Sequence, residues 1–575
     1  MNTKIQTPQT QTPAKTQTFS SDLINFIKGR FGSIPIIAEK HGETLCVRLA
    51  QRVDDDAFRR YIEVAKSLGM RFTDSKMWCA HAETIKEKMN NVVGKYYRSF
   101  YYFRLPSYDS YETLRRISCY TVEKWKQENG RLRREEVEIC LHSCDGDECR
   151  IPRGLAPAVA RAFGWNLPLF ATNLRPPSEE HLNGLRGYQI EVFKSVFEQL
   201  RQSGAAVVQM ATGAGKTHLA GHIAKWLSDQ GYTVFTVAMQ KDLAIQLKEH
   251  AQRVGAKNVI AVTTQYLYRR LLMNGENGDE NGIDEESKEV LEYADDYSDL
   301  DDETLMRLFK QKNVAVIMDE VHHVPARTVK KVMIEAGDGW ALRIGLSATP
   351  WRSDGRDLEI YAYAGTVVEP RISSSYLIKN GYAVPVEIRV VEAPYCEEVE
   401  ECEGERGAAA YMCVRKALVE CEERNRFIVE LAVKVEKPIL IITPLVKHAE
   451  KLYRLAKAAG LKAALVTGVV KAEKRKEIYD ALRRGEIEVL IATTLADEGL
   501  DLPPLRTLII AFGGKSKTRT LQRIGRLVRP YEGKKIAVAY ELKEDCPYIA
   551  DHLEMRLKLY RTEPHWRIVF VDSTE

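Results

Sequence analysis

The chain has 575 residues, of which 45% are hydrophobic and 29% charged, as in globular proteins with several domains. Its formal net charge is only +4, so the overall charge does not mark a nucleic-acid-binding protein, and any such surface must be a local patch. No apolar run approaches the roughly 20 residues of a membrane-spanning helix, which argues against a membrane protein. Residues 1–20 are rich in Thr, Gln and Pro and lack a signal peptide's apolar core, so we expect a disordered tail, an intracellular protein and mostly reduced cysteines.

Residues 21–175 are expected to form a first, mixed α+β domain. Its predicted helices cover 22–27 and 54–68, and its predicted strands cover 34–38, 44–49, 70–72 and 77–80. The segment 95–116 interleaves Tyr and Phe with basic residues, including Arg98 and Arg104. Such a surface could stack on bases and hold phosphates. Strand and helix core with ordinary surface charge explains the same pattern equally well, because aromatic residues are good strand formers.

A cysteine and histidine cluster follows in the same domain. Cys140, His142, Cys144 and Cys149 lie close in sequence and could hold zinc. Their spacing matches no paired C-x₂-C arrangement, and no second ligand pair follows at a usual distance. Reduced cysteines near a loop are therefore favoured over a metal site.

A glycine-rich stretch, 210–217, reads Met-Ala-Thr-Gly-Ala-Gly-Lys-Thr between an apolar strand at 205–208 and a helix at 218–229. A strand, a glycine-rich turn and a helix form a phosphate-binding loop, although Met210 stands where the usual pattern begins with glycine. Lys216 should reach the β- and γ-phosphates and Thr217 should ligate Mg²⁺. Gln189, in the stretch Arg186-Gly-Tyr-Gln189 just ahead, offers an amide that suits an adenine edge.

Strands and helices then alternate, which is typical of parallel sheets. In the first domain, expected at 176–370, the predicted elements are strands 233–238, 259–263, 314–318 and 342–346 and a helix at 241–253. An acidic stretch, 274–303, is expected to be a solvated, mobile surface insertion. After a linker at 371–437, the second domain at 438–575 has predicted strands 439–443, 463–466, 489–493, 507–512 and 536–540 and helices 447–459 and 471–484. It has no phosphate loop of its own, and the fold class is α/β.

Two further stretches complete a nucleotide site. Asp319 and Glu320 follow an apolar strand, at the sheet edge where open α/β sheets bind ligands. Asp319 should hold Mg²⁺ and Glu320 should position the attacking water. In the second domain Arg526 and Arg529 are three residues apart, so a helix places both on one face, where guanidinium groups suit a transferring phosphoryl group.

The ordered motifs resemble those of superfamily 2 helicases over about residues 180–542. They are 186–189, 210–217, 319–322 (Asp-Glu-Val-His), 347–349 (Ser-Ala-Thr), 494–501 and 522–529. The resemblance implies two RecA-like domains that clamp ATP and Mg²⁺, with nucleic acid running across both. The residues implied to contact the nucleotide are Arg186, Gln189, Thr212, Gly213, Ala214, Gly215, Lys216, Thr217, Gly499 and Asp501, with Gln522, Arg526 and Arg529 from the second domain. Ser347 and Thr349 should couple hydrolysis to domain motion, His323 either bridges the domains or is a surface histidine, and Thr264 and Thr494 should contact the nucleic-acid backbone.

Within this superfamily, residues 345–354 and 377–385 resemble the xeroderma-pigmentosum group B repair helicases and phage fork-remodelling helicases. The first group has an Arg-Glu-Asp triplet where this chain has Arg352-Ser353-Asp354. The resemblance implies an ATP-dependent 3′-to-5′ DNA helicase or double-strand translocase in repair or fork remodelling. It also implies that residues 21–175 correspond to a DNA-recognition domain, and contact with a protein partner is the alternative for this region. An RNA-directed helicase, or a DNA-binding scaffold that uses ATP as a conformational switch, are the alternatives.

Overall fold

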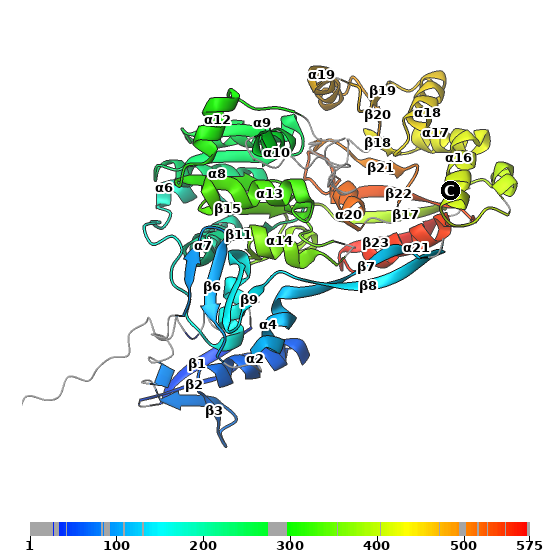
Figure 1. Ribbon diagram of the computed structural model, residues 1–575. Coiled ribbons are helices and arrows are strands. Elements are labelled where there is room, and N and C mark those ends of the chain that lie inside the picture. The colour runs from blue at the N-terminus through cyan, green and yellow to red at the C-terminus, as the bar shows by residue number, and fades with distance from the viewer. Residues whose placement is uncertain are drawn as a thin grey trace, which may run out of the picture. The chain divides into compact units, whose positions relative to one another are not determined.

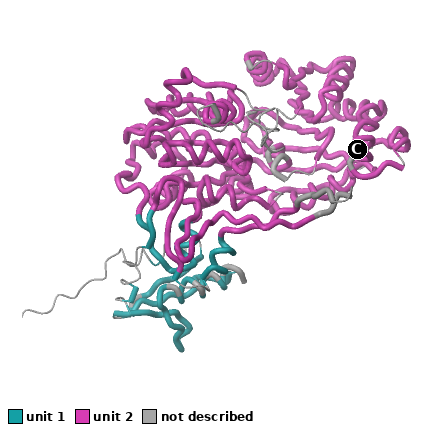
Figure 2. The backbone as a smooth tube through the Cα atoms, viewed as in Figure 1, with its two compact units in different colours: residues 1–95, 106–117, 156–168 teal, residues 96–105, 118–155, 169–575 magenta. Residues whose placement is uncertain are grey.

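The computed structural model describes residues 27, 34–41, 43–53, 55–81, 84–85, 93–106, 110–128, 131–273, 296–352, 355–402, 404–470, 472–493, 502–514, 517–525, 527–546 and 548–571. The chain forms two compact units (Figure 2). One contains residues 1–95, 106–117 and 156–168, and the other contains 96–105, 118–155 and 169–575. The range 21–175, expected as one domain, is therefore shared between the two units. The tail at 1–20 and most of the acidic stretch, 274–295, lie outside the described residues.

The smaller unit has its own antiparallel sheet in the order β1-β2-β4-β3. Its strands are β1 (Ile36–His41), β2 (Thr44–Leu49), β3 (Arg71–Phe72) and β4 (Trp78–His81), with helices α2 (Asp55–Ser67), α4 (Ser110–Ser118) and α5 (Ala156–Phe163). Leu45, Val47 and Tyr61 are buried between the sheet and α2. The strands and the second helix expected for this part of the chain are thus present, whereas the helix expected at 22–27 lies outside the described residues apart from residue 27.

The first sheet of the larger unit is parallel, in the order β13-β12-β14-β15-β11-β16. Its strands are β11 (Ala205–Gln209), β12 (Thr233–Ala238), β13 (Val259–Thr263), β14 (Val314–Met318), β15 (Leu342–Ser347) and β16 (Thr366–Val367). Alternate residues of β14 enter different cores, because successive side chains of a strand point to opposite faces. Ala315 and Ile317 pack with helices α7 (Gly187–Ser203), α8 (Lys216–Ser228) and α9 (Lys241–Arg253). Val314 and Val316 pack with α10 (Thr264–Met273), α12 (Asp302–Phe309), α13 (Arg327–Glu335) and α14 (Asp357–Ala364).

The second sheet is also parallel, in the order β19-β20-β18-β21-β22-β17-β23. Its strands are β17 (Val386–Glu392), β18 (Ile439–Ile442), β19 (Ala463–Val466), β20 (Val489–Ala492), β21 (Thr507–Ile510), β22 (Ala537–Lys543) and β23 (Trp566–Val571). The helices are α15 (Ser374–Lys379), α16 (Gly407–Glu420), α17 (Glu422–Lys434), α18 (Val446–Ala458), α19 (Ala472–Arg483), α20 (Lys517–Gly525) and α21 (Ile549–Tyr560). Figure 1 shows yellow-green β17 between the later strands β22 and β23. Part of the segment expected as a linker, 371–437, therefore belongs to this sheet.

A third sheet of the larger unit, β5-β6-β10-β9, carries the aromatic and basic segment. Its strands are β5 (Lys95–Tyr97), β6 (Phe100–Arg104), β9 (Ser143–Asp145) and β10 (Glu148–Pro152). Arg153, just after β10, is fully buried, and its guanidinium donates to the carbonyls of Gly339 (2.9 Å) and Arg98 (3.2 Å). Burial lowers the pKa of Arg153, and neighbouring Arg343 lowers it further. Backbone acceptors at Gly339 thus join this sheet to the first parallel-sheet domain.

The expectation of reduced cysteines is wrong, because ten of the eleven cysteines pair. The bonds are Cys46–Cys79, Cys119–Cys140, Cys144–Cys149, Cys396–Cys421 and Cys402–Cys413, and Cys546 is free and buried. Such pairing is usual in oxidising compartments and inside hyperthermophiles. Cysteine counts cannot show it, because partners such as Cys46 and Cys79 meet only when strands β2 and β4 pair in register.

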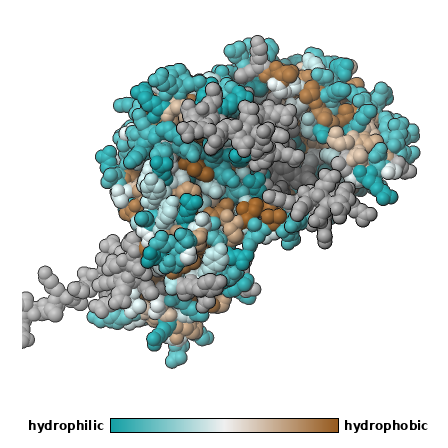
Figure 3. Space-filling view, viewed as in Figure 1, coloured by the Kyte–Doolittle hydropathy of each residue, from teal (hydrophilic) through white to brown (hydrophobic). Residues whose placement is uncertain are grey.

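Among the described residues that are visible in Figure 3, hydrophilic ones predominate and hydrophobic ones form separate small groups. Among the described residues, no helix has both the length and the apolar character needed to cross a membrane.

Candidate active site

The phosphate loop connects β11 to α8 and begins at Met210. Gly213 (φ 84°) and Gly215 (φ 81°) have left-handed backbone conformations, which glycine adopts without steric cost. Met210 is fully buried in the core, its N–H donates to the Ser347 carbonyl (3.1 Å), and its carbonyl accepts from Lys216 Nζ (3.0 Å). A core side chain thus replaces the usual first glycine while the loop keeps its turn at the start of α8.

The stretch ahead of α7 supports this loop from behind. The Gln189 side chain accepts from the Arg186 N–H (2.9 Å) and donates to the carbonyls of Ala214 and Gly215 (both 3.2 Å). Tyr188, which the sequence analysis did not single out, donates its hydroxyl to the Ala214 carbonyl (2.9 Å). Gln189 is only 2% exposed, so its amide holds the phosphate loop in place. The sequence analysis assigned this amide to an adenine edge, whereas in the structure it donates to the phosphate loop.

Asp319 and Glu320 follow β14 at the same edge of the sheet. Glu320 has a left-handed backbone (φ 49°), a conformation that is uncommon outside glycine and that clusters at functional sites. Its carboxylate lies 3.2 Å from His322 Nδ1. Burial raises the pKa of Glu320, but His322, Lys216 and His323 outweigh it and the pKa falls to about 2. The group is therefore a carboxylate at neutral pH, held close to the lysine of the phosphate loop.

The stretch at the end of β15 also reaches this edge, because β15 lies between β14 and β11. The Ser347 hydroxyl lies 3.4 Å from His322 Nδ1 and accepts from the Thr349 N–H at 3.1 Å. His322 thus contacts both Glu320 and Ser347. The sequence analysis had selected His323, whose ring lies 4.3 Å from that of His322. The sequence does not show which of the two neighbouring histidines points toward Glu320, because the backbone turn after Glu320 decides it.

The second domain reaches the phosphate loop through the end of α20. A Cβ atom placed on Gly525 would lie 2.6 Å from Thr212 Cβ, so only glycine fits at that position. A Cβ atom on Gly213 would lie 3.5 Å from Arg529 Cγ. Burial, with help from nearby Arg483, lowers the pKa of Arg529 to about 10, so it stays charged at neutral pH. The structure therefore brings Arg529 and the phosphate loop together, as the motif order predicts.

Several predicted residues are not placed in this site. Thr494, Gly499, Asp501 and Arg526 lie outside the described residues, as does the side chain of Gln522. Thr264 is fully buried and its hydroxyl donates to the Ala238 carbonyl (3.4 Å), so this hydroxyl binds protein rather than facing a nucleic-acid backbone.

The aromatic and basic segment divides between core and surface. Tyr101 and Phe103 are buried, whereas Tyr97 is 53% exposed. The Arg98 side chain is 48% exposed and pairs with Asp338 (3.0 Å), and the Arg104 side chain is 69% exposed and pairs with Glu148 (2.6 Å). Both alternatives for this segment therefore apply, to different side chains.

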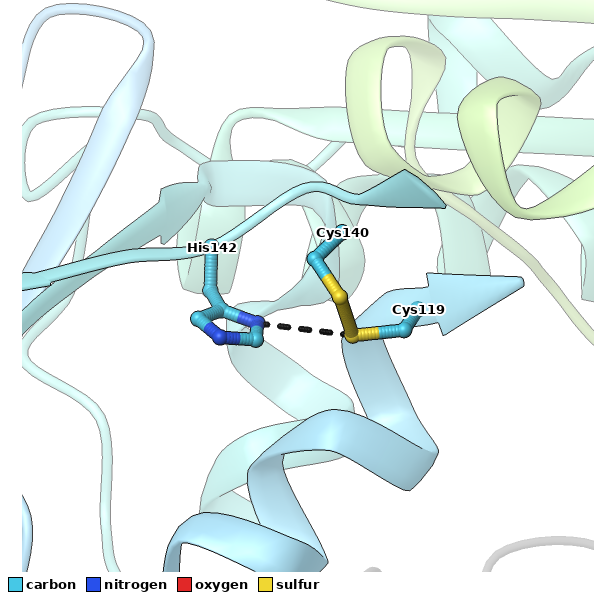
Figure 4. Close-up of side chains that lie close together, drawn as sticks. All are labelled: Cys119, Cys140 and His142. Atoms are coloured by element: carbon cyan, nitrogen blue, oxygen red, sulfur yellow. Dashed lines mark hydrogen bonds between the residues drawn. A yellow bond between two sulfur atoms is a disulfide. The ribbon is translucent and has the colours of Figure 1, made fainter. Parts of the chain in front are cut away.

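The cysteine and histidine cluster has disulfides instead of a metal centre (Figure 4). Figure 4 shows the bond between Cys140 and Cys119. A second bond joins Cys144 to Cys149. His142 Nδ1 lies 2.7 Å from the Ser118 hydroxyl and 3.7 Å from Cys119 Sγ. Sulfur atoms in a disulfide cannot act as thiolate ligands, so the pairing removes the donors that zinc would need.

Comparison with known proteins matches both parallel-sheet domains to described families. Residues 183–352 match the res subunit of type III restriction enzymes, and residues 423–531 match the helicase conserved C-terminal domain. Putative helicase 22 of Sulfolobus islandicus filamentous virus is 28% identical over 78% of this chain and 78% of its own length. DNA 3'-5' translocase XPB2 of Sulfurisphaera tokodaii is 25% identical over 63% of this chain and 83% of its own. ATP-dependent DNA helicase uvsW of Enterobacteria phage T4 is 23% identical over 39% of this chain and 44% of its own length. The solved structure of T4 UvsW is 16% identical and covers 84% of this chain and 99% of its own chain, with a TM-score of 0.31.

The two family matches cover the phosphate loop, the Asp319-Glu320 turn and the arginines near α20, in the order that the motifs require. Both matched regions form parallel sheets with helices on each face. The chain thus has the two RecA-like domains of a nucleic-acid-dependent ATPase, and it resembles superfamily 2 helicases, the XPB and UvsW proteins among them.

Proposed function

We propose that the chain is an ATP- and Mg²⁺-dependent 3′-to-5′ DNA helicase or double-strand DNA translocase that acts on forked or branched DNA in repair or fork remodelling. The main support is the approach of Arg529 from one domain to Gly213 in the other, beside Glu320 and Ser347. Relatives named a DNA 3'-5' translocase and an ATP-dependent DNA helicase support DNA as the substrate and this direction. An intracellular location is part of the same proposal.

The residues at the sheet edge fit a magnesium nucleotide. Gly213 and Gly215 turn the backbone at the N-terminus of α8, a geometry that binds phosphate oxygens through N–H groups. The Thr217 hydroxyl and the Asp319 carboxylate supply the oxygen donors that Mg²⁺ prefers. Bound ATP supplies the phosphoryl group whose hydrolysis drives movement, and Lys216 contacts its terminal phosphates.

The roles of the other side chains follow from their contacts. Glu320 is held ionised and accepts a hydrogen bond from the attacking water, while Arg529 stabilises the charge that develops on the transferring group. His322 contacts both Glu320 and Ser347, so a movement of the water-positioning carboxylate changes the position of Ser347 at the end of β15. We assign Ser347 and Thr349 to coupling on this basis. Gln522 and Arg526 join Arg529 by their place in the same motif.

Arg98 and Arg104 remain candidates for DNA contact outside the motor motifs. Both pair with a carboxylate at the surface, and exposed pairs contribute only about 0–1 kcal/mol. A phosphate could therefore replace either carboxylate at little cost. Contact of residues 21–175 with a protein partner is the alternative.

The test compares ATPase rates with double-stranded DNA, single-stranded DNA and RNA, followed by strand displacement from 3′-tailed, 5′-tailed, forked and four-way-junction substrates. We expect stimulation by DNA and displacement of 3′-tailed or branched substrates. Stimulation by RNA alone would replace the proposal with an RNA helicase. Negligible turnover with every nucleic acid would identify a scaffold that uses ATP as a conformational switch.

A further inference from the structure

A long two-stranded ribbon belongs to the larger unit but to none of its parallel sheets. Strands β7 (Cys119–Glu128) and β8 (Arg131–Cys140) pair residue by residue, from Cys119 with Cys140 to Glu128 with Arg131. Among the described strands they pair only with each other, and Figure 1 shows them as an extended hairpin. Ten residues per strand give a length of roughly 30 Å, and the Cys119–Cys140 disulfide closes the base.

Charge is divided along this hairpin. By sequence, the distal part, 124–134, has five basic residues and one acidic residue, Glu128, a net charge of +4 (5 − 1). The basal parts, 119–123 and 135–140, have four glutamates and no basic residue. The basic residues are Lys124, Lys126, Arg131, Arg133 and Arg134. Trp125 lies among them and pairs in register with Arg134. Clustered Lys and Arg with an aromatic residue are the groups that bind phosphates and stack on bases.

The base of the hairpin is tied to α14 through a buried carboxylate. The Tyr120 hydroxyl donates to Glu359, whose side chain is 3% exposed and also accepts from Lys330 (2.8 Å) and Arg356 (3.1 Å). Burial raises the pKa of Glu359, but the donors Lys330 and Tyr120 outweigh it and the pKa is lowered. The carboxylate is therefore charged at neutral pH and holds three groups from different parts of the chain.

Two arginines continue this network to the turn after Glu320. Arg356 donates to the Pro325 carbonyl, and Arg352 donates to the His322 carbonyl at 3.2 Å. His322 contacts Glu320 directly. Hydrogen bonds from Glu359 through Arg356 thus reach the Pro325 carbonyl, and the short backbone turn from Pro325 to His322 leads on to the carboxylate that faces the phosphate loop. A contiguous set of contacts of this kind is the physical connection that coupling between two sites needs.

We propose that the β7–β8 hairpin is a nucleic-acid-contacting arm of the motor and that Glu359 is a positioning residue that ties the arm to the turn after Glu320. The proposal rests on the proposed function, because it takes DNA as the ligand. Phosphates bind the basic distal part of the arm. Displacement of the arm changes the position of Tyr120 and, through Glu359 and Arg356, the turn that holds the water-positioning carboxylate.

The arm is tested with a variant in which Lys126, Arg131 and Arg133 are changed to Ala, and the matched control changes Arg426, Lys474 and Lys558, exposed basic residues elsewhere, to Ala. We measure affinity for a forked DNA at several salt concentrations, with basal ATPase alongside. Loss of three phosphate contacts should reduce the slope of log K against log salt by about 2.7, with basal ATPase and the control slope unchanged. An unchanged slope in the arm variant would show that the arm does not bind DNA phosphates.

The tie is tested with Tyr120→Phe, which removes one hydroxyl and keeps the ring. Loss of a hydrogen bond to a charged group should reduce the DNA-stimulated ATPase by about tenfold, while basal ATPase, DNA affinity and melting temperature stay the same. A purely structural role would instead lower the melting temperature and basal rate together, and full stimulation would overturn the coupling. Glu359→Gln is the second variant and should also lose DNA stimulation while it keeps basal ATPase, although its melting temperature falls because Lys330 and Arg356 lose a buried charged partner. Wild-type protein without any DNA stimulation would reject the proposed function itself, a result distinguishable from either failure above.

Discussion

Arg529 offers the sharpest test of how the two domains form one ATP site. Its side chain lies against Gly213 of the phosphate loop, and a pKa of about 10 keeps it charged up to about pH 9. An arginine that stabilises a transferring phosphoryl group contributes about 10³- to 10⁵-fold to kcat. A role in ground-state binding would instead contribute one charge-assisted hydrogen bond, about 1.5–3 kcal/mol, which corresponds to roughly 10- to 150-fold in affinity.

We therefore expect Arg529→Ala to lower kcat by about 10³-fold or more while nucleotide Kd changes less than about fivefold. Steady-state hydrolysis at saturating ATP gives kcat, and titration with a fluorescent ATP analogue gives Kd. The kcat of Arg529→Lys should lie between those of Arg529→Ala and wild type, since lysine keeps the charge without the planar fork. Arg426→Ala, at an exposed position of α17, is the control and should match wild type. Equal losses in kcat and affinity would refute the reasoning, and retained turnover would place Arg529 away from the γ-phosphate.

Other substitutions test the catalytic carboxylate, the core and the disulfides. Glu320→Gln should abolish steady-state hydrolysis yet still bind ATP, and normal turnover would remove Glu320 from its water-positioning role. Arg556→Ala leaves the fully buried Glu541 without its bidentate partner, at a cost of about 3–5 kcal/mol, or roughly 6–20 °C in melting temperature by calorimetry. Arg484→Ala, which breaks an exposed pair with Glu486, should lower the melting temperature by no more than about 2–4 °C. Equal shifts in the two variants would contradict the buried-pair argument. A thiol titration of denatured, unreduced protein should find one free thiol, and eleven free thiols would reject the pairing. Reduction should lower the melting temperature, because each disulfide contributes about 2–4 kcal/mol to stability.

The sequence by itself determined the features that depend on neighbours along the chain. The strand, turn and helix around the phosphate loop follow from an apolar run, two glycines and a helix start within a dozen or so residues, and they are present at β11 and α8. Asp319 and Glu320 follow β14 for the same reason, since a continuous apolar strand ends where polar residues begin. Alternation of such units predicts parallel sheets, because each crossover helix returns the chain in the same direction.

Only the tertiary structure decided which distant segments meet. β17 joins β22, about 150 residues later, and no periodicity in either strand encodes that pairing. The cysteines pair because strand registers bring them together, and sequence composition pointed to free thiols. Likewise Gln189 and His322 acquired their roles from backbone groups and side chains that fold against them, at Ala214 and Ser347. Local spacing fixes the type of each element and the residues at its end, whereas partners across sheets are chosen by packing of the whole chain.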